Sequence, residues 1–174
     1  PSHFQDRPAI FAEERKQIHA LEEKYDNVHV VRPVALGGSL GYYGGEDMDE
    51  KTSMMAYSDV FVTVYSTMVV EAAVHNRPIV AAVIDTPGGW NKPGKYSLAL
   101  QKIGGWPTHL RFREANAGGV AKTAGELQDV VNAYLKDISL DREERKTFIE
   151  QEISFTDAGS GKRTAEFILK VLGG

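Results

Sequence analysis

The chain has 174 residues, of which 42% are hydrophobic and 25% charged, a balance typical of one folded globular domain. Its net charge of −4 argues against a strong electrostatic grip on nucleic acid or on an anionic membrane. The sequence contains no cysteine, which excludes disulfides and thiolate metal sites and fits a reducing compartment. The longest apolar runs, residues 60–64 and 79–84, are far shorter than the roughly 20 residues of a spanning helix, so no membrane span is predicted.

The first third of the chain is expected to contain two helices and a strand. A helix is predicted over residues 6–25, because Asp6 can cap it and apolar residues recur at helical spacing. Residues 28–31, Val-His-Val-Val, are predicted as a short strand. A glycine-rich stretch at residues 37–45 then leads into a short helix, expected from about residue 49 to residue 57.

The middle of the chain carries the strongest pattern. Residues 59–64 consist of Asp59 and a continuous run of mostly apolar, β-branched residues, as expected for a strand covered on both faces. Ser66 or Thr67 can cap the helix that follows, and Pro78 opens a second buried strand at residues 79–84. A strand, a helix and a strand in so short a segment imply parallel strands joined by a right-handed crossover. We therefore expect a Rossmann-like, three-layer α/β/α domain with a parallel sheet.

The last part of the chain is expected to be helical after a loop at residues 86–94. Three helices are predicted to close the chain: residues 123–136 behind a Thr123–Glu126 capping box, a segment beginning near Asp141, and residues 160–172. Between the loop and these helices, Arg111 and Arg113 alternate around Phe112. That alternation is expected to place both arginines on one face of a strand.

Ligands of open parallel sheets bind outside the carboxyl ends of the strands, which points to residues 32–35, 65–67 and 85–89. A helix that starts at Ser66 and Thr67 directs backbone N–H groups and the positive end of its dipole toward the ligand space. A diphosphate suits such a position. Glu71, one turn further, can accept hydrogen bonds from paired hydroxyls of a ribose or a sugar. Spacing alone leaves open that Ser66 is only an N-cap and Glu71 only a surface charge.

Two segments resemble a known family. The run YSDVFVTVYSTMVVEAA at residues 57–73, followed by NRPIV at 76–80, resembles the donor-binding segment of GT-B glycosyltransferases. That segment has an Asp before an apolar strand, a Ser/Thr pair, Glu-Ala, and a Pro that opens the next strand. The tail at residues 155–166 resembles the closing helix of the same half, particularly in glycerophosphotransferases of teichoic acid synthesis.

The resemblance implies a substrate-binding site for the donor. Its residues would be Tyr65, Ser66, Thr67, Glu71, Arg32, Pro33, Val34 and His3. Ser66 and Thr67 would hold the diphosphate, and Glu71 would bind the ribose or sugar hydroxyls. The turn at residues 32–34 would lie against the base. His3 stands where some relatives have a phosphate-contacting histidine, although a terminal histidine without a role remains an open alternative.

The resemblance also implies an activity, namely transfer of a sugar from a UDP-, GDP- or CDP-linked donor to an acceptor hydroxyl. Residues 1–174 would be the single donor-binding domain, the C-terminal half of a GT-B enzyme whose N-terminal acceptor domain is absent. The general base is expected on that domain, so no catalytic residue is assigned and the fragment alone is expected to be inactive. No metal or cofactor is expected, because the histidines show no ligand spacing. The enzyme would be cytoplasmic, or peripheral to the inner face of the membrane through the full-length protein.

Other functions remain open. A glycerophosphotransferase, a sugar-nucleotide 2-epimerase half, or a non-catalytic nucleotide-sugar-binding module would share the predicted fold, although the epimerase normally has a Gly-Gly after the serine. Ser66, Asp85 and His109 follow the chain order of an α/β-hydrolase triad. The residues around Ser66 lack the glycines of a sharp nucleophile turn, which argues against a hydrolase.

Overall fold

The computed structural model describes residues 12–31, 44–84 and 100–173. The chain divides into two compact units, residues 1–54 and residues 55–174, and the division falls inside one helix. The first unit contains α2 (Ala12–Lys24) and most of α3 (Gly45–Tyr57), which begins earlier than predicted. Within the described residues, no helix has the length and apolarity needed to cross a membrane.

The strand predicted at residues 28–31 is not present, and that prediction was wrong. A strand needs the backbone of a partner, but the Val30 N–H donates to the carboxylate of Glu22 at 2.9 Å. The start of the predicted first helix lies outside the described residues, whereas its continuation is confirmed by α2.

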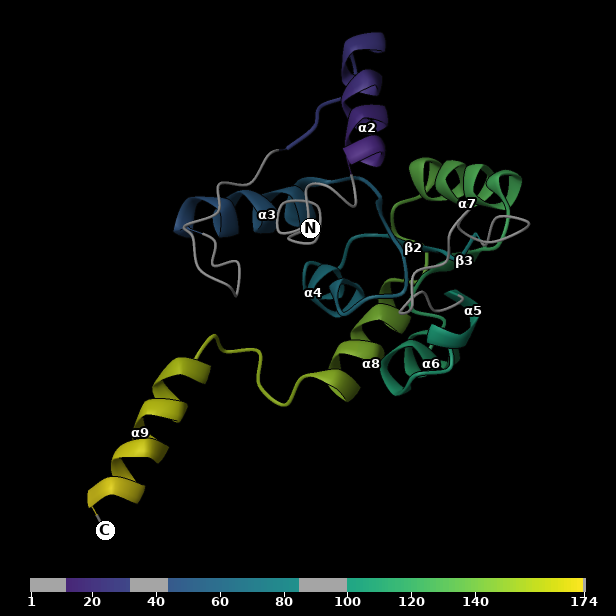
Figure 1. Ribbon diagram of the computed structural model, residues 1–174. Helices are drawn as coiled ribbons and strands as arrows, with labels where there is room; N and C mark the ends of the chain where they lie inside the picture. Colours follow the sequence, from purple (N-terminus) through teal and green to yellow (C-terminus); the bar gives the residue numbers. More distant parts are fainter. Residues whose placement is uncertain (1–11, 32–43, 85–99, 174) are drawn as a thin grey trace. The chain divides into compact units, whose positions relative to one another are not determined.

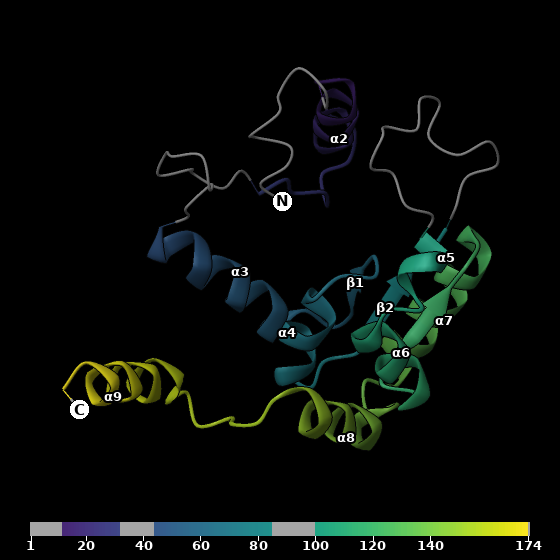
Figure 2. The ribbon, with the colours of Figure 1, turned by 60° about the horizontal axis from the view of Figure 1, so that its bottom comes forward.

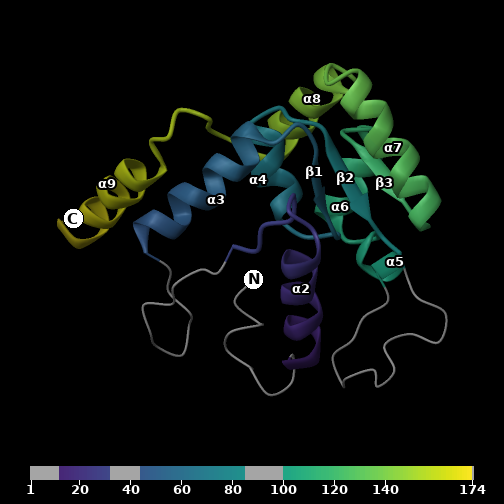
Figure 3. The same ribbon diagram turned by 90° about the horizontal axis from the view of Figure 1, so that it is seen from above.

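The second unit is built on a parallel sheet of three strands in the order β1 (Phe61–Thr63), β2 (Ile79–Ala82), β3 (Gly119–Ala121). Val62 pairs with Val80, and Ala81 pairs with Val120. Figure 3 shows the three strands side by side. The first two strands were predicted and are shorter than expected, whereas β3 was not predicted, because three residues that begin with a glycine show no strand pattern.

Helices cover both faces of this sheet. One face carries α4 (Met68–Val74), α6 (Pro107–Glu114) and α8 (Arg142–Glu152), and the other carries α7 (Ala124–Lys136). Figures 1 and 2 show α8 beside α6, and α7 beside the sheet. The expected three-layer α/β/α arrangement is therefore confirmed.

The helices near the end of the chain were predicted in part. The capping box of α7 is confirmed, because the Glu126 N–H donates to Thr123 Oγ1 at 3.1 Å. The helices α8 and α9 (Ser160–Gly173) are confirmed as well. The short α5 (Leu100–Ile103) and α6 were not predicted, and α6 contains Arg111 and Arg113. The strand expected there was wrong, and residues two apart on a helix point in different directions.

A buried arginine links α8 to the turn between α4 and β2. The side chain of Arg145 is 0% exposed, and its Nε donates to Asn76 Oδ1 at 3.1 Å. Its Nη1 donates to the Leu140 carbonyl at 2.8 Å, while its Nη2 has no hydrogen-bond partner among the described residues. Burial lowers the pKa of Arg145, because the charged guanidinium is removed from water. Asn76 adopts a left-handed backbone conformation (φ 51°), which few residues other than glycine and asparagine tolerate well.

Gly118 allows the chain to pass close beneath β2. A Cβ at this position would lie 2.4 Å from the carbonyl oxygen of Ile79 and 2.7 Å from Cζ of Phe112. Gly118→Ala should therefore lower the free energy of unfolding by about 1–3 kcal/mol, the usual cost of overpacking a core. Urea denaturation measures this loss. Gly125→Ala is the matched control, because its Cβ would meet nothing closer than 3.9 Å in helix α7. A Gly118→Ala variant as stable as the parent would contradict tight packing around Gly118.

Candidate functional site

The carboxyl edge of the sheet carries the serine and threonine expected to bind the donor. The chain leaves β1 at Thr63 and enters α4 through Ser66 and Thr67. Ser66 Oγ accepts a hydrogen bond from the Met68 N–H at 3.2 Å and lies 3.4 Å from Thr63 Oγ1. The Ser66 hydroxyl thus accepts from the first residue of the helix, although the N-cap itself is Thr67 and not Ser66.

Thr67 and Glu71 are better placed for a ligand. Both side chains are exposed, and their four-residue separation puts them on the same face of α4. The Thr67 side chain makes no capping hydrogen bond. The backbone N–H groups of Ser66 and Thr67 donate to no described residue, as is common for the first N–H groups of a helix. The structure therefore brings two backbone donors, a hydroxyl and a carboxylate to one end of α4.

Tyr65 belongs to the core under this edge. Its side chain is buried, and its ring packs on the ring of His109 with centroids 5.0 Å apart. Burial raises the pKa of the Tyr65 hydroxyl, while the neighbouring Arg113 lowers it to a smaller extent. The contact of Tyr65 with the donor stays a prediction.

A polar cluster from α6 and α8 lies around His109. Glu152 accepts hydrogen bonds from the Arg111 guanidinium and, at 3.2 Å, from the Thr108 hydroxyl. The bond from Arg111 is the main cause that lowers the pKa of Glu152. Sequence reasoning missed Glu152 because the two helices that form the cluster are about 40 residues apart in the chain, and no local pattern joins them.

The other predicted site residues belong to segments outside the described ranges. Arg32, Pro33, Val34 and His3 lie outside the described residues, and so does Asp85 of the hydrolase alternative. His109, the third member of that triad, is only 4% exposed and packs on Tyr65.

The sequence contains one pair of carboxylates at a spacing that can suit a metal ion. Asp47 and Asp49 have the Asp-x-Asp spacing that lets two carboxylates share a cation in a loop, but both lie on helix α3. Two residues apart on a helix, their side chains diverge. In the part of the chain that the structure describes, no three histidine, aspartate or glutamate side chains gather as a metal site.

Burial of His109 predicts how stability depends on pH. Removal from water lowers the pKa of His109 below its usual 6.5, although Glu152 opposes the shift, and Nδ1 has no partner among the described residues. The unfolded chain therefore takes up a proton more readily than the folded chain. Above pH 6.5 His109 is neutral in both states and should not change the free energy of unfolding with pH. As the pH falls below 6.5, protonation of the unfolded chain should lower the free energy of unfolding.

The variant His109→Phe should lose the part of the pH dependence that His109 causes, because phenylalanine does not titrate. Urea denaturation at pH 7 and pH 5 should show a smaller drop in unfolding free energy for His109→Phe than for the parent. His29→Gln, which changes an exposed histidine, is the control and should keep the parental drop. An equal drop in His109→Phe would show that His109 does not carry the effect.

Comparison with known proteins identifies the family. Residues 45–170 match the family described as CDP-Glycerol:Poly(glycerophosphate) glycerophosphotransferase. The match covers the whole sheet, α4 with Ser66, Thr67 and Glu71, and the polar cluster around His109. No curated protein and no solved structure gives a significant match to the chain. Since the match covers well over half of the residues, this chain belongs to the CDP-glycerol:poly(glycerophosphate) glycerophosphotransferase family, a family of transferases.

Proposed function

We propose that this chain binds the nucleotide-diphosphate-linked donor of a transferase at the carboxyl edge of its sheet. The observation that carries the proposal is the position of Ser66 and Thr67, which follow β1 at the start of α4, inside the segment that matches the transferase family. Parallel sheets commonly bind nucleotides at this edge. Arg32, Pro33, Val34 and His3 remain proposed contacts of the base and phosphates.

The chemistry of the edge suits a diphosphate. The backbone N–H groups of Ser66 and Thr67 and the exposed Thr67 hydroxyl are donors, and phosphate oxygens are acceptors. The seven residues of α4 add the positive end of a short helix dipole. Glu71 supplies an acceptor on the same face, where paired hydroxyls of a ribose or of the transferred group can donate to it. These donors would also stabilise the charge that develops on the leaving phosphate.

The family description makes a CDP-linked glycerol the first donor to test. In such a transfer an acceptor hydroxyl attacks the β-phosphorus, the bond from that phosphorus to the bridging oxygen breaks, and CMP leaves with the bond electrons. In a sugar transfer the hydroxyl attacks the anomeric carbon instead, and a nucleoside diphosphate leaves. The departing nucleotide therefore distinguishes the glycerophosphotransferase from the glycosyltransferase.

The rest of the machinery is also a proposal. We place the acceptor site and the general base on an N-terminal domain, with residues 1–174 as the donor-binding half of a GT-B enzyme. The enzyme would work in the cytoplasm or at the inner face of the membrane.

Ligand-dependent stability tests the donor class. Thermal unfolding should shift upward with CDP and CDP-glycerol, because a ligand present at 100 times its Kd stabilises the folded state by about 2.7 kcal/mol. UDP, GDP and their sugars serve as the comparison panel. Stabilisation by UDP- or GDP-sugars alone would favour sugar transfer, and the absence of a shift with every nucleotide would contradict donor binding.

Substitutions on α4 test the site itself. Thr67→Val and Glu71→Ala should each weaken binding of the stabilising nucleotide by about 1–3 kcal/mol, the scale for a polar group that loses its partner. Thr67→Ser keeps the hydroxyl and should bind as the parent does. Glu150→Ala, which removes an exposed carboxylate from α8, controls for the change in net charge. Isothermal titration measures the affinities, and parental affinity in both α4 variants would remove this face from the site.

A further inference from the structure

A hollow of about 320 Å³ lies at the opposite edge of the sheet from Ser66. Its walls come from the end of α3, from the turn between α4 and β2, and from the segment between α7 and α8. Pro78, in its lining, directly precedes β2, whereas Ser66 follows β1. Since the strands are parallel, the hollow is at their amino ends and is separate from the proposed donor site.

The side chains that line this hollow include basic groups and no acidic one. His75, Arg77 and Arg142 are its ionisable residues, and the other members of the lining are Ala56, Asn76, Pro78 and Ile138. The chain as a whole carries a net charge of −4. A concave surface lined only by basic and neutral groups on an acidic chain favours a small anion.

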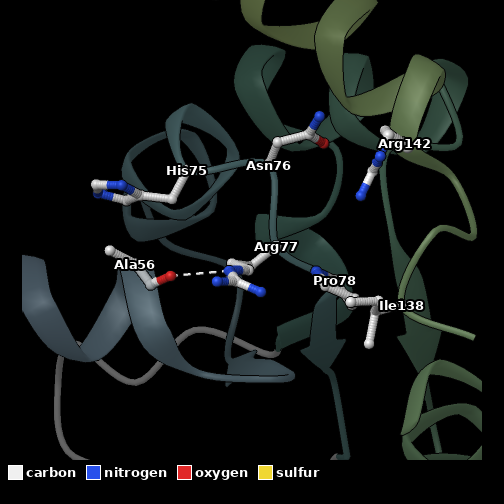
Figure 4. Close-up of a pocket in the computed structure, with 7 residues that line it drawn as sticks. All are labelled: Ala56, His75, Asn76, Arg77, Pro78, Ile138 and Arg142. Atoms are coloured by element: carbon white, nitrogen blue, oxygen red, sulfur yellow. Dashed lines mark hydrogen bonds between the residues drawn. The ribbon is translucent and has the colours of Figure 1, made fainter. Parts of the chain in front are cut away.

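Arg77 is held in place by its own backbone contact. Its Nε donates to the Ala56 carbonyl at 2.8 Å, and its side chain is half-buried. The terminal nitrogens of Arg77 make no hydrogen bond to any described residue. Figure 4 shows the guanidinium of Arg77 beside Ala56, to which the hydrogen bond from Nε joins it. A guanidinium fixed through Nε presents its other N–H groups without the entropy cost of ordering a free side chain.

Arg142 enters the hollow from the side of α8. Its side chain is exposed, and Figure 4 shows it directed toward Pro78 and Ile138. Its charge acts on Arg145, one turn further along α8, and contributes to the lowered pKa of that buried residue. An anion beside Arg142 would offset this repulsion between like charges.

Asp137 is the nearby carboxylate that could compete for Arg142. Its pKa is lowered chiefly by hydrogen bonds from Ser139, and Arg142 is the last of the contributing causes. Asp137 Oδ1 accepts from the Ser139 N–H at 2.9 Å and from the Ser139 hydroxyl at 2.6 Å. The carboxylate of Asp137 therefore interacts mainly with Ser139, and no ion pair joins Asp137 to Arg142 among the described residues.

We infer that this hollow is a second anion site, one that binds a phosphate group between Arg77 and Arg142. Guanidinium groups match the spacing of phosphate oxygens and form strong, charge-assisted hydrogen bonds with them. His75 also lines the hollow. The site does not depend on the donor site, because no residue is shared between them. It can hold a phosphate monoester or one phosphodiester unit of a longer anionic chain.

Site-resolved NMR of the whole chain tests this inference. The probes are inorganic phosphate for the monoester class and dimethyl phosphate for the diester class, each titrated into ¹⁵N-labelled protein. Saturable shifts are expected at the amides of residues 75–78 and 138–142 and at the Nε–H resonance of Arg77. Saturation by dimethyl phosphate supports a site for a phosphodiester chain, and saturation by inorganic phosphate alone supports a site for a free monoester. The amides of residues 66–71 report on binding at the donor site and those of residues 75–78 on binding in the hollow. The absence of binding at one site can therefore be told from the absence of binding at the other.

Arg142→Gln is the decisive variant, because the side chain is exposed and its loss should leave the fold intact. It should weaken phosphate binding by roughly tenfold, as expected for losing a charge-assisted hydrogen bond. Lys146→Gln removes the same charge from the same helix outside the hollow and should bind as the parent does. An equal loss in both variants, or no saturable shift at residues 75–78 with either probe, would overturn the inference.

Discussion

The second unit depends on the burial of β2 on both of its faces. Ile79, Val80 and Ala81 are each 0% exposed, and they alternate between the two helical layers. Ile79 and Ala81 pack against α4, α6 and α8, whereas Val80 packs against α7. Full burial of a valine or isoleucine side chain contributes about 1.5–3 kcal/mol, so this short strand holds both layers to one sheet. The burial of β2 therefore positions the helices whose ends lie at the two edges of the sheet.

Because the strands are parallel, the two edges of the sheet differ in chemistry. The carboxyl edge presents the start of α4, with backbone donors and Thr67, and this is where we propose that the donor binds. The amino edge presents the end of α4 and the start of α8, with Arg77 and Arg142. Separate sites at the two edges would let the domain hold a donor and a second phosphate group at the same time.

The polar interactions of the core fix the helices that carry these edges. Arg145 links α8 to Asn76 in the turn before β2, and Glu152 links the other end of α8 to Arg111 on α6. Both links join parts of the chain that are far apart in sequence. Loss of Asn76 would leave the guanidinium of the fully buried Arg145 short of a further hydrogen bond, which is costly. The amino-edge hollow and the cluster under the carboxyl edge thus share one supporting helix.

The sequence by itself determined the βαβ unit, the parallel pairing of its strands, and the helices α7, α8 and α9. These features rest on local patterns: an apolar run, a capping box and helical periodicity, which report on neighbouring residues. The resemblance carried by residues 57–80 also led to the transferase family that matches the chain. The predicted roles of Ser66, Thr67 and Glu71 are still predictions.

Only the tertiary structure decided the third strand, the helical state of Arg111 and Arg113, and the absence of a strand at residues 28–31. A strand forms where a neighbouring strand offers backbone hydrogen-bond partners. Gly119 lies in β3 because β2 lies beside it. The Val30 N–H donates to the Glu22 carboxylate, and Val30 is not part of a strand. The same holds for the basic hollow, whose residues come from distant segments. Side chains meet through the packing of whole elements, and local sequence patterns do not record that packing.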